Sequence, residues 1–465
     1  MASPADVDDD IKCMHEAWKL TGTLLGGTTA MRNAGKAYLP QFPKEEEEDY
    51  KRRLKVSVLF PGYSRTVATL SGKPFSKPVT LSEKFDEEAK DWMANVDGEG
   101  RNLHSFLGDC MTVAMGYGLG GILVDHPRRP EGATTKAADK ALGMRPYWLL
   151  IKPHQILGYR TKTTGSHTEF TMLRYMEQVT EDDGEWGKTT VNQVRVWIKV
   201  DNIVGWATYR QDKASVWNMH DNAATTISEI PFVPFYGKRL GFMHAEPPLL
   251  EVAHLNVAHW QSASDQQNIL HVARVPLLFM KGFDDNTTLS VGSSVAIRAS
   301  MPDADMKYVE ITGASIKAGA DDLEALEERM RQAGAELLVL DPRYTATQVT
   351  TDNAVGMCAL QKIVQDLQDA ANRAIEFSLM WVNREAGEST VVIFNDFGSL
   401  TLAEASADLL LRSNQAGKLS DQTYLNELRR RGILGPDVDV TEELDRLQSQ
   451  GPNLGDLNDG NNPAQ

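Results

Sequence analysis

Three of the ten histidines lie in the stretch "PPLLEVAHLNVAHWQSASDQQNILHVARVP", residues 247–276, whose prolines suit the two ends of one long helix. Histidines that share one helix face can bind a metal ion together. At 100° per residue, however, His259 lies about 140° round the helix from His254, and His271 lies about 120° further on. The three side chains therefore point in different directions, and we expect them at the helix surface or in hydrogen bonds between helices, without a metal.

The middle of the same stretch, "QSASDQQN", is unusual for a surface helix because its side chains are small or amide-bearing and carry one formal charge. A helix that packs on one side only normally shows an apolar stripe with charges opposite it. We therefore expect this helix to be crowded by neighbours, and packing between subunits is one interpretation. The residues predicted at these contacts are His259, Ser262, Ser264 and Gln267.

The glycines Gly116, Gly118 and Gly121 in "GYGLGG" match the G-x-G-x-x-G fingerprint of dinucleotide sites. That motif binds a pyrophosphate only when a strand precedes it and a helix follows it. Here the pattern predicts the reverse order, so we expect the glycines to end a helix and turn the chain. The patterns G-x-x-x-x-G-K-[ST] and G-x-S-x-G are both absent, and no cofactor is predicted.

An acid and a base stand side by side at Asp125 and His126, which leaves an enzyme with acid–base chemistry as an alternative. Neighbours on a strand point to opposite faces, and a chain with 64 acidic residues contains such pairs by chance. The cysteines Cys13, Cys110 and Cys358 lie too far apart for a Cys-x-x-Cys zinc site and are expected as buried thiols. No catalytic or metal-binding residue is predicted, and we expect the chain not to be an enzyme.

Composition is that of a globular protein, with 465 residues, 42% of them hydrophobic and 24% charged, enough for two or three domains. No run approaches the roughly 18 apolar residues of a membrane helix, and "MASPADVDDD" lacks the features of a signal peptide, so a soluble protein made in a cytoplasm is expected. The formal net charge of −16 argues against a protein that grips nucleic acid through its phosphates. It does not exclude a surface past which DNA slides, and acidity for solubility alone is the simpler interpretation.

The elements that position these residues predict an α+β fold. Helical patterns fill the chain to about Gly121, and short strands rich in β-branched and aromatic residues follow to about Tyr236, as in an antiparallel sheet. After the long helix come strands at "VPLLFMKGF", "SSVAIRA" and "KYVEIT", then a helix over 320–338, the polar loop "DPRYTATQVTTDNA", a helix over about 355–385, and the strand "STVVIFND". A helical C-terminal part precedes a tail without structure signals.

This order of elements resembles that of the portal proteins of tailed bacteriophages. Particular stretches resemble a phage and prophage portal subfamily long filed as a domain of unknown function: "RTVATLSGKPFSKP", "GILVDHPRR", "EIPFVPFYGKRLGFM", "PPLLEVAHLNVAHWQSASDQQNILHVARVPLLF" and "NDFG". The likeness extends to about Gly435. These stretches are not catalytic signatures, so they imply a relative and not a reaction.

The resemblance implies a portal fold with a helical stem, a mixed α/β wing, a small β-containing clip and a helical crown. In that family twelve copies form a ring around a channel at one capsid vertex, through which double-stranded DNA is packaged and ejected. By order of elements, the regions are an N-terminal wing (1–246), a first stem helix (247–273), a clip (274–318), a second stem helix (319–340), a tunnel loop (341–353), a long wing helix and strand (354–402), a crown (403–449) and a disordered tail (450–465).

The implied site residues lie in the tunnel loop and the clip. Those that would face DNA are Arg343, Tyr344, Thr345, Thr347 and Gln348, although a solvated connector is the simpler interpretation of this loop. Those that would dock other proteins are Lys281, Asp284, Asp285 and Asn286. The implied partners are further copies of the chain, double-stranded DNA without sequence specificity, the terminase large subunit, a head–tail adaptor and the major capsid protein, with no membrane.

The implied location is a capsid vertex of the virion, after assembly in the host cytoplasm. Another structural virion protein, such as a minor capsid component, is the alternative to a portal.

Overall fold

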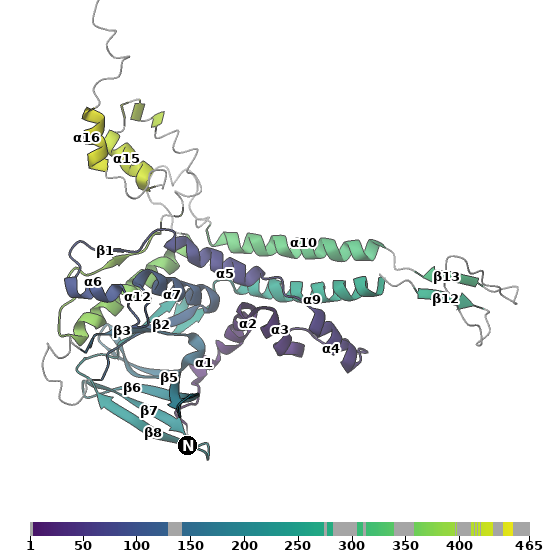
Figure 1. Cartoon of the computed structure of the whole chain (residues 1–465), viewed down its shortest axis with the longest axis horizontal. Helices are drawn as coiled ribbons and strands as arrows, with labels where there is room; N and C mark the ends of the chain where they lie inside the picture. Colours follow the sequence, from purple (N-terminus) through teal and green to yellow (C-terminus); the bar gives the residue numbers. More distant parts are fainter. Residues whose placement is uncertain are drawn as a thin grey trace, which may run out of the picture. The chain divides into compact units, whose positions relative to one another are not determined.

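The computed structural model describes residues 3–128, 142–273, 277–281, 305–309, 313–338 and 358–395, with short pieces from there to residue 449 (Figure 1). The chain divides into two compact units, Met1–Phe394 and Asn395–Gln465. In the second unit, where the resemblance implies a crown from residue 403, the longer described helices are α15 (Asp421–Arg430) and α16 (Val440–Ser449). None of the described helices is long and apolar enough to span a membrane.

The N-terminal part is helical, as its sequence pattern predicts. Its elements are α1 (Asp9–Lys12), α2 (His15–Leu25), α3 (Gly27–Ala34), η1 (Gly35–Ala37), α4 (Glu47–Val56), α5 (Gly62–Gly72), η2 (Lys73–Phe75), α6 (Glu87–Met93) and α7 (Leu103–Tyr117). Side-chain caps fix two of the starts, since Asp86 accepts from the backbone of α6 and Asn102 accepts from that of α7. Three carboxylates in the first turn of α4 lie near its positive end, where they stabilise the helix.

The glycine-rich turn after α7 has the role predicted for it. Gly118 follows the last helical residue with φ at 83°, a left-handed conformation that glycine adopts without strain. A Cβ there would also overlap the backbone of Glu246. The next strand begins at Leu119, so the glycines end a helix and turn the chain, without the strand–helix order of a nucleotide site.

The strand-rich region forms two main antiparallel sheets instead of the single sheet expected. One sheet has the order β3 (Tyr147–Ile151), β2 (Leu119–Asp125), β9 (Phe232–Tyr236). The other has the order β4 (Ile156–Thr164), β5 (His167–Asp183), β6 (Gly187–Val200), β7 (Ile203–Gln211), β8 (Trp217–Ala224), with η3 (Pro153–Gln155) before it. Asp201 and Asn202 both have positive φ in the two-residue turn from β6 to β7, as a tight hairpin of matched twist requires.

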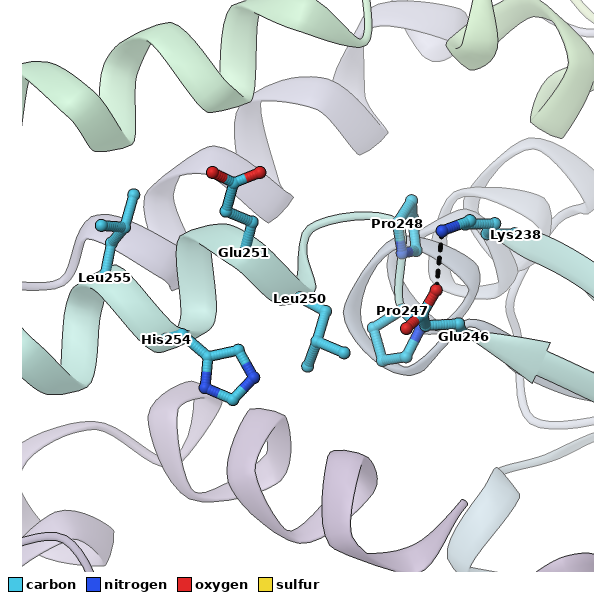
Figure 2. A pocket seen from close by; sticks show the side chains of 8 residues that line it. All are labelled: Lys238, Glu246, Pro247, Pro248, Leu250, Glu251, His254 and Leu255. Carbon is cyan, nitrogen blue, oxygen red and sulfur yellow. Dashed lines mark hydrogen bonds and ion pairs between the residues drawn. The ribbon is translucent and has the colours of Figure 1, made fainter. Parts of the chain in front are cut away.

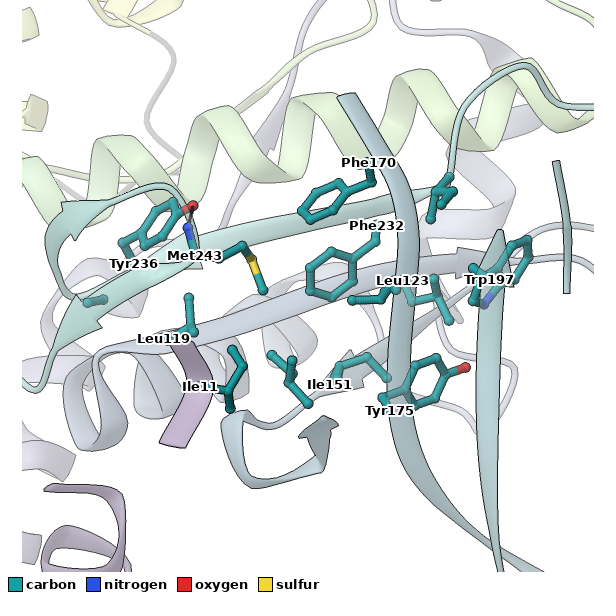
Figure 3. Packing of buried hydrophobic residues seen from close by; sticks show 14 of the residues in the cluster. Ile11, Leu119, Leu123, Ile151, Phe170, Tyr175, Trp197, Phe232, Tyr236 and Met243 are labelled. Carbon is teal, nitrogen blue, oxygen red and sulfur yellow. Dashed lines mark hydrogen bonds between the residues drawn. The ribbon is translucent and has the colours of Figure 1, made fainter. Parts of the chain in front are cut away.

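The main hydrophobic core lies between these two sheets and is closed by the N-terminal helices (Figure 3). Phe170 of the larger sheet and Phe232 of the smaller one meet edge to face, with ring centroids 5.6 Å apart. Trp197 and Leu123 are fully buried in the same cluster, and Ile11 of α1 covers its edge. Helices and antiparallel sheets thus share one core, which confirms the α+β fold class.

Helix α12 (Ala359–Trp381) packs on the smaller sheet with apolar residues recurring at three- and four-residue steps. Trp148 donates its indole N–H to Ser378 Oγ of α12 at 2.8 Å, and Trp381 donates to the Val124 carbonyl at 3.0 Å. The strand expected after this helix is short, with β14 (Val391–Val392) paired to β1 (Thr80–Leu81).

Two long helices follow the hairpin of β10 (Lys238–Gly241) and β11 (His244–Glu246). They are α9 (Leu250–Ala273) and α10 (Gly313–Glu336), each of 24 residues, and they lie side by side and antiparallel (Figure 1). Between them in the chain, β12 (Leu277–Lys281) and β13 (Asp305–Val309) pair as a two-stranded sheet. Helix α10 begins seven residues before the predicted start at 320, and in this added stretch Gln266 of α9 donates to the Ile316 carbonyl.

Candidate functional site

The candidate site is the helix pair α9–α10, because the residues singled out by sequence lie along it. Three polar contacts join the two helices. His259 Nε2 lies 3.5 Å from Glu327 Oε1, and Ser262 Oγ donates to Asp322 Oδ2 at 2.9 Å. Gln266 Nε2 donates to the Ile316 carbonyl at 2.7 Å, next to Gly319, whose missing Cβ leaves room for the amide.

His259 is the one histidine of the three that lies inside the helix packing. It is 5% exposed and its ring lies 5.0 Å from that of Phe60, whereas His254 and His271 are exposed. Burial lowers the pKa of His259 below its ordinary value of 6.5, and the nearby Glu327 carboxylate acts in the opposite direction. The histidines scatter as the helical geometry predicts, and no group of three metal-ligating side chains occurs among the described residues.

A buried amide fixes the first half of α9 to the start of α5. The Asn256 side chain is completely buried and accepts from the Tyr63 backbone N–H at 2.8 Å. It also donates to the Phe60 carbonyl at 2.9 Å. Because both the oxygen and the nitrogen of the amide have hydrogen-bond partners, burying the side chain costs little free energy. The two hydrogen bonds also fix the rotation of α9 about its own axis.

A buried arginine fixes the second half of α9 to α4. The Arg53 side chain is 5% exposed and makes a two-point contact with Glu45, with Nε–Oε1 2.7 Å and Nη2–Oε2 2.8 Å. These hydrogen bonds hold the pKa of Glu45 below its ordinary value. Arg53 Nη2 also donates to the Pro40 carbonyl at 2.8 Å, and Nη1 lies 3.7 Å from Asp265 of α9. Burial raises the pKa of Asp265, and Arg53 opposes that shift.

Ser264 belongs to this arginine cluster, which corrects our interpretation of its helix face. It is 2% exposed, accepts from Ser57 Oγ at 3.0 Å and lies 3.4 Å from Arg53 Nη1. The small side chain is therefore required by α4 of the same chain. His259 and Ser262 likewise contact α10 of their own chain, and of the four predicted packing residues only Gln267 is exposed.

A shallow hollow of about 530 Å³ lies beside the start of α9 (Figure 2). His254 and Glu251 border it from the helix, and Lys238 pairs with Glu246 at 2.7 Å on its other side. The hollow brings together the imidazole of His254 and the carboxylates of Glu251 and Glu246, and Glu246 is already paired with Lys238. These groups do not identify a reaction.

The Asp125–His126 pair does not form a catalytic unit. Asp125 is 3% exposed and binds Arg195 at 2.6 Å, while the His126 ring stacks on Trp381 with centroids 5.5 Å apart. His126 Nδ1 lies 2.9 Å from the Pro127 carbonyl. The two side chains thus serve different structural contacts.

The cysteines differ from the expectation at one position. Cys110 and Cys358 are buried, and burial raises the pKa of the Cys110 thiol well above its ordinary value. Cys13 is exposed, because the short helix α1 turns only Ile11 into the core.

The other predicted site residues lie mostly outside the described residues. These are Arg343, Tyr344, Thr345, Thr347 and Gln348 of the tunnel loop and Asp284, Asp285 and Asn286 of the clip. Lys281 is described: it is exposed at the end of β12, opposite Asp305 of β13.

Sequence reasoning missed the role of α4. A signal was present, since Tyr50, Arg53 and Ser57 recur at the spacing of one helix face and are all buried, while the apolar Val56 is 55% exposed. A buried arginine and an exposed valine on one short helix indicate that α4 contacts polar partners on its inner side.

Comparison with known proteins gives one family match. The family described as a domain of unknown function (DUF4055) matches residues 248–382, which run from the start of α9 through α12. No curated protein matches the chain.

Similar folds occur in solved structures of GTA particles. The neck of an empty GTA particle computed with C6 symmetry is 12% identical, with a TM-score of 0.43 and coverage of 81% of this chain and 90% of that one. The neck of a native GTA particle computed with C12 symmetry is 11% identical, with a TM-score of 0.42 and coverage of 87% and 99%. Similarity at this level carries no functional argument.

Proposed function

We propose that this chain is a portal protein, a subunit of a ring whose channel passes double-stranded DNA into and out of a capsid. The observation that carries the proposal is the helix–sheet–helix arrangement of α9, β12, β13 and α10. Two 24-residue antiparallel helices are anchored at one end in the wing body and joined at the other through a small sheet. This is the arrangement that the sequence resemblance implies for a stem and clip.

The composition of the helix pair supports a role in assembly. The first half of α9 buries Val252, Ala253 and Trp260. Alongside them, hydrogen bonds and close contacts to α4, the start of α5 and α10 are made by Asn256, His259, Ser264 and Gln266. Helix α10 uses Leu326 and Met330 for its inner face and exposes its outer face over its whole length. A helix pair of this kind gains its remaining stability from a neighbour.

The net charge supports passage of DNA without retention. Each subunit carries −16, so a ring of such subunits repels the phosphate backbone over most of its surface. Against this background a single ring of arginines acts as a local guide or brake. We propose that Arg343 and Tyr344 of the loop 341–353, with Thr345, Thr347 and Gln348, face the DNA.

The proposed partners follow from the same role. The β12–β13 end, with Lys281 and the segment of Asp284, Asp285 and Asn286, docks the packaging motor and later the tail adaptor, and the wing contacts the major capsid protein. ATP hydrolysis belongs to the separate terminase in this scheme.

DNA packaging tests the proposal. Particles assembled with the full-length chain should package and retain DNA, and particles lacking it should stay empty. Arg343→Glu and Tyr344→Ala should lower the packaged or retained DNA, whereas Lys213→Glu, the same charge change in an exposed wing turn, should not. Full packaging without the chain would refute the portal role, and normal packaging and retention by both loop variants would refute the role of the loop.

A further inference from the structure

A groove of about 990 Å³ runs between α4 and the second half of α9. One wall carries Phe42, Arg52 and Val56, and the other carries Gln267, Asn268 and His271. Phe42 is 42% exposed and Val56 is 55% exposed, so two large apolar side chains face solvent beside the amides of α9. Two helices that leave between them a groove with exposed apolar side chains can receive a third helix.

The outer face of α10 carries small exposed residues that would allow it to pack into such a groove. Ala314, Ala318, Asp321, Ala325 and Glu328 follow one another at steps of four and three residues and are all exposed. This spacing places them along one side of the helix. Because three of the five are alanines, another helix surface can approach closely.

The charges of the two surfaces are complementary. Three basic residues, Lys44, Arg52 and Arg53, and two carboxylates, Glu45 and Asp49, line the groove. The Arg52 side chain is 73% exposed and lies 3.5 Å from Asp49. The first three turns of α10 carry Lys317, Asp321 and Asp322, a net charge of −1. Opposite charges at the rim of a contact steer association and fix its register.

The two surfaces also lie at the same level along the helix pair. Ser262 of α9 bonds to Asp322 of α10, and Gln266 bonds to Ile316, so residues 264–271 of α9 lie level with the first turns of α10. Rotation about a ring axis parallel to the pair preserves that level. With such an axis, the first turns of α10 in one copy would stand level with the groove of the next.

We propose that the groove between α4 and α9 receives the first three turns of α10 from a second copy of this chain, with Ala314 and Ala318 turned inward and Asp321 toward Arg52. The proposal depends on the ring of the proposed function and names the contact that closes it. In the proposed contact, α4 packs against Ser264 with its inner side and against the neighbouring subunit with its outer side.

Disulfide trapping tests the contact in the full-length chain. In a Cys13→Ser background, Val56→Cys is combined with Ala314→Cys or with Ala318→Cys and the assembled protein is oxidised. At least one pair should give a ladder of covalent multimers on a denaturing gel, because a disulfide requires close approach of the two Cα atoms. Val58→Cys with the same partners is the matched control, since Val58 is 57% exposed but does not line the groove.

Exchange of the two charges tests the proposed alignment of Asp321 in one copy with Arg52 in the next. Arg52→Glu and Asp321→Arg should each lower ring assembly at equal concentration by about tenfold or more, and the double variant should restore most of it. Melting of each variant at low concentration checks that the monomer still folds. Failure of the unchanged chain to form rings would refute the proposed function itself. Rings that form normally in both single variants, with no ladder from either cysteine pair, would refute only the groove contact.

Discussion

The core between the two main sheets and the contacts of α9 hold the chain together in different ways. This core is closed by large apolar side chains such as Trp197, Phe170 and Phe232, and its residues come from both sheets and from α1. The inner face of α9 buries Val252, Ala253 and Trp260 and adds buried polar groups such as Asn256 and Ser264, which have hydrogen-bond partners within the chain.

The difference shows that two kinds of interaction have different roles in this chain. Apolar burial stabilises a core in proportion to area and needs no partner of exact geometry. Polar contacts add little net free energy, but they fix the rotation and level of a helix. The core between the sheets is therefore held by apolar area, and the helix pair is additionally held by polar contacts that fix its geometry.

The largest expected effect comes from the core between the two main sheets. Trp197→Ala should lower the free energy of unfolding by about 3–5 kcal/mol, because it removes a fully buried side chain from between the sheets. Trp186→Ala, at a hairpin tip where the indole is 90% exposed, should change it little. Denaturant unfolding followed by far-UV circular dichroism measures both, and equal losses in the two variants would contradict the core assignment.

The buried ion pair should give the next largest effect. Arg53→Met removes the partner of Glu45 and should cost about 3 kcal/mol of unfolding free energy, since a buried carboxylate is left without its cation. Arg52→Met at the neighbouring exposed position is the control and should change the free energy by less than about 0.5 kcal/mol. Denaturant unfolding measures both variants. An unchanged free energy of unfolding in Arg53→Met would show that Glu45 is satisfied by water or by another partner.

Ser264→Arg should lower stability by about 2 kcal/mol, because it forces a second cation and a longer side chain against Arg53. Its effect on assembly should therefore follow from loss of folding. Gln267→Arg, one turn along α9 and exposed, should leave monomer stability unchanged. A stable monomer of Ser264→Arg that fails to form rings would restore the original interpretation of this face as a contact between subunits.

The smallest effect concerns pH at the α9–α10 contact. Since the pKa of His259 is lowered in the folded chain, the unfolded chain binds the proton more readily, and stability falls as pH drops below about 6.5. His259→Gln should remove this part of the pH dependence. Unfolding free energies of both proteins between pH 7.5 and about 5.5 measure it, and parallel curves would contradict the assignment.

The sequence is sufficient to predict the elements whose signals are local. The proline-bounded helix α9, the glycine turn at Gly118 and the amphipathic helix α12 lie close to where their patterns place them. The scattered histidines also follow from helical geometry alone. Local steric and periodic signals decide these features before any tertiary contact forms.

Other features depend on contacts between distant segments and could not be predicted in the same way. The division of the strands into two sheets depends on β2 pairing with β9 more than a hundred residues later. The burial of Ser264 depends on Arg53, which lies 211 residues away in the chain. No periodicity within α9 carries that information, which is why small residues that serve α4 were interpreted as a surface for other copies.

The most direct test of the portal proposal is the mass and shape of the purified full-length protein. Native mass spectrometry together with negative-stain imaging should show closed rings with a central channel, of about twelve copies each, as the resemblance implies. A protein that stays monomeric or dimeric at all concentrations and salt conditions would contradict the proposed function.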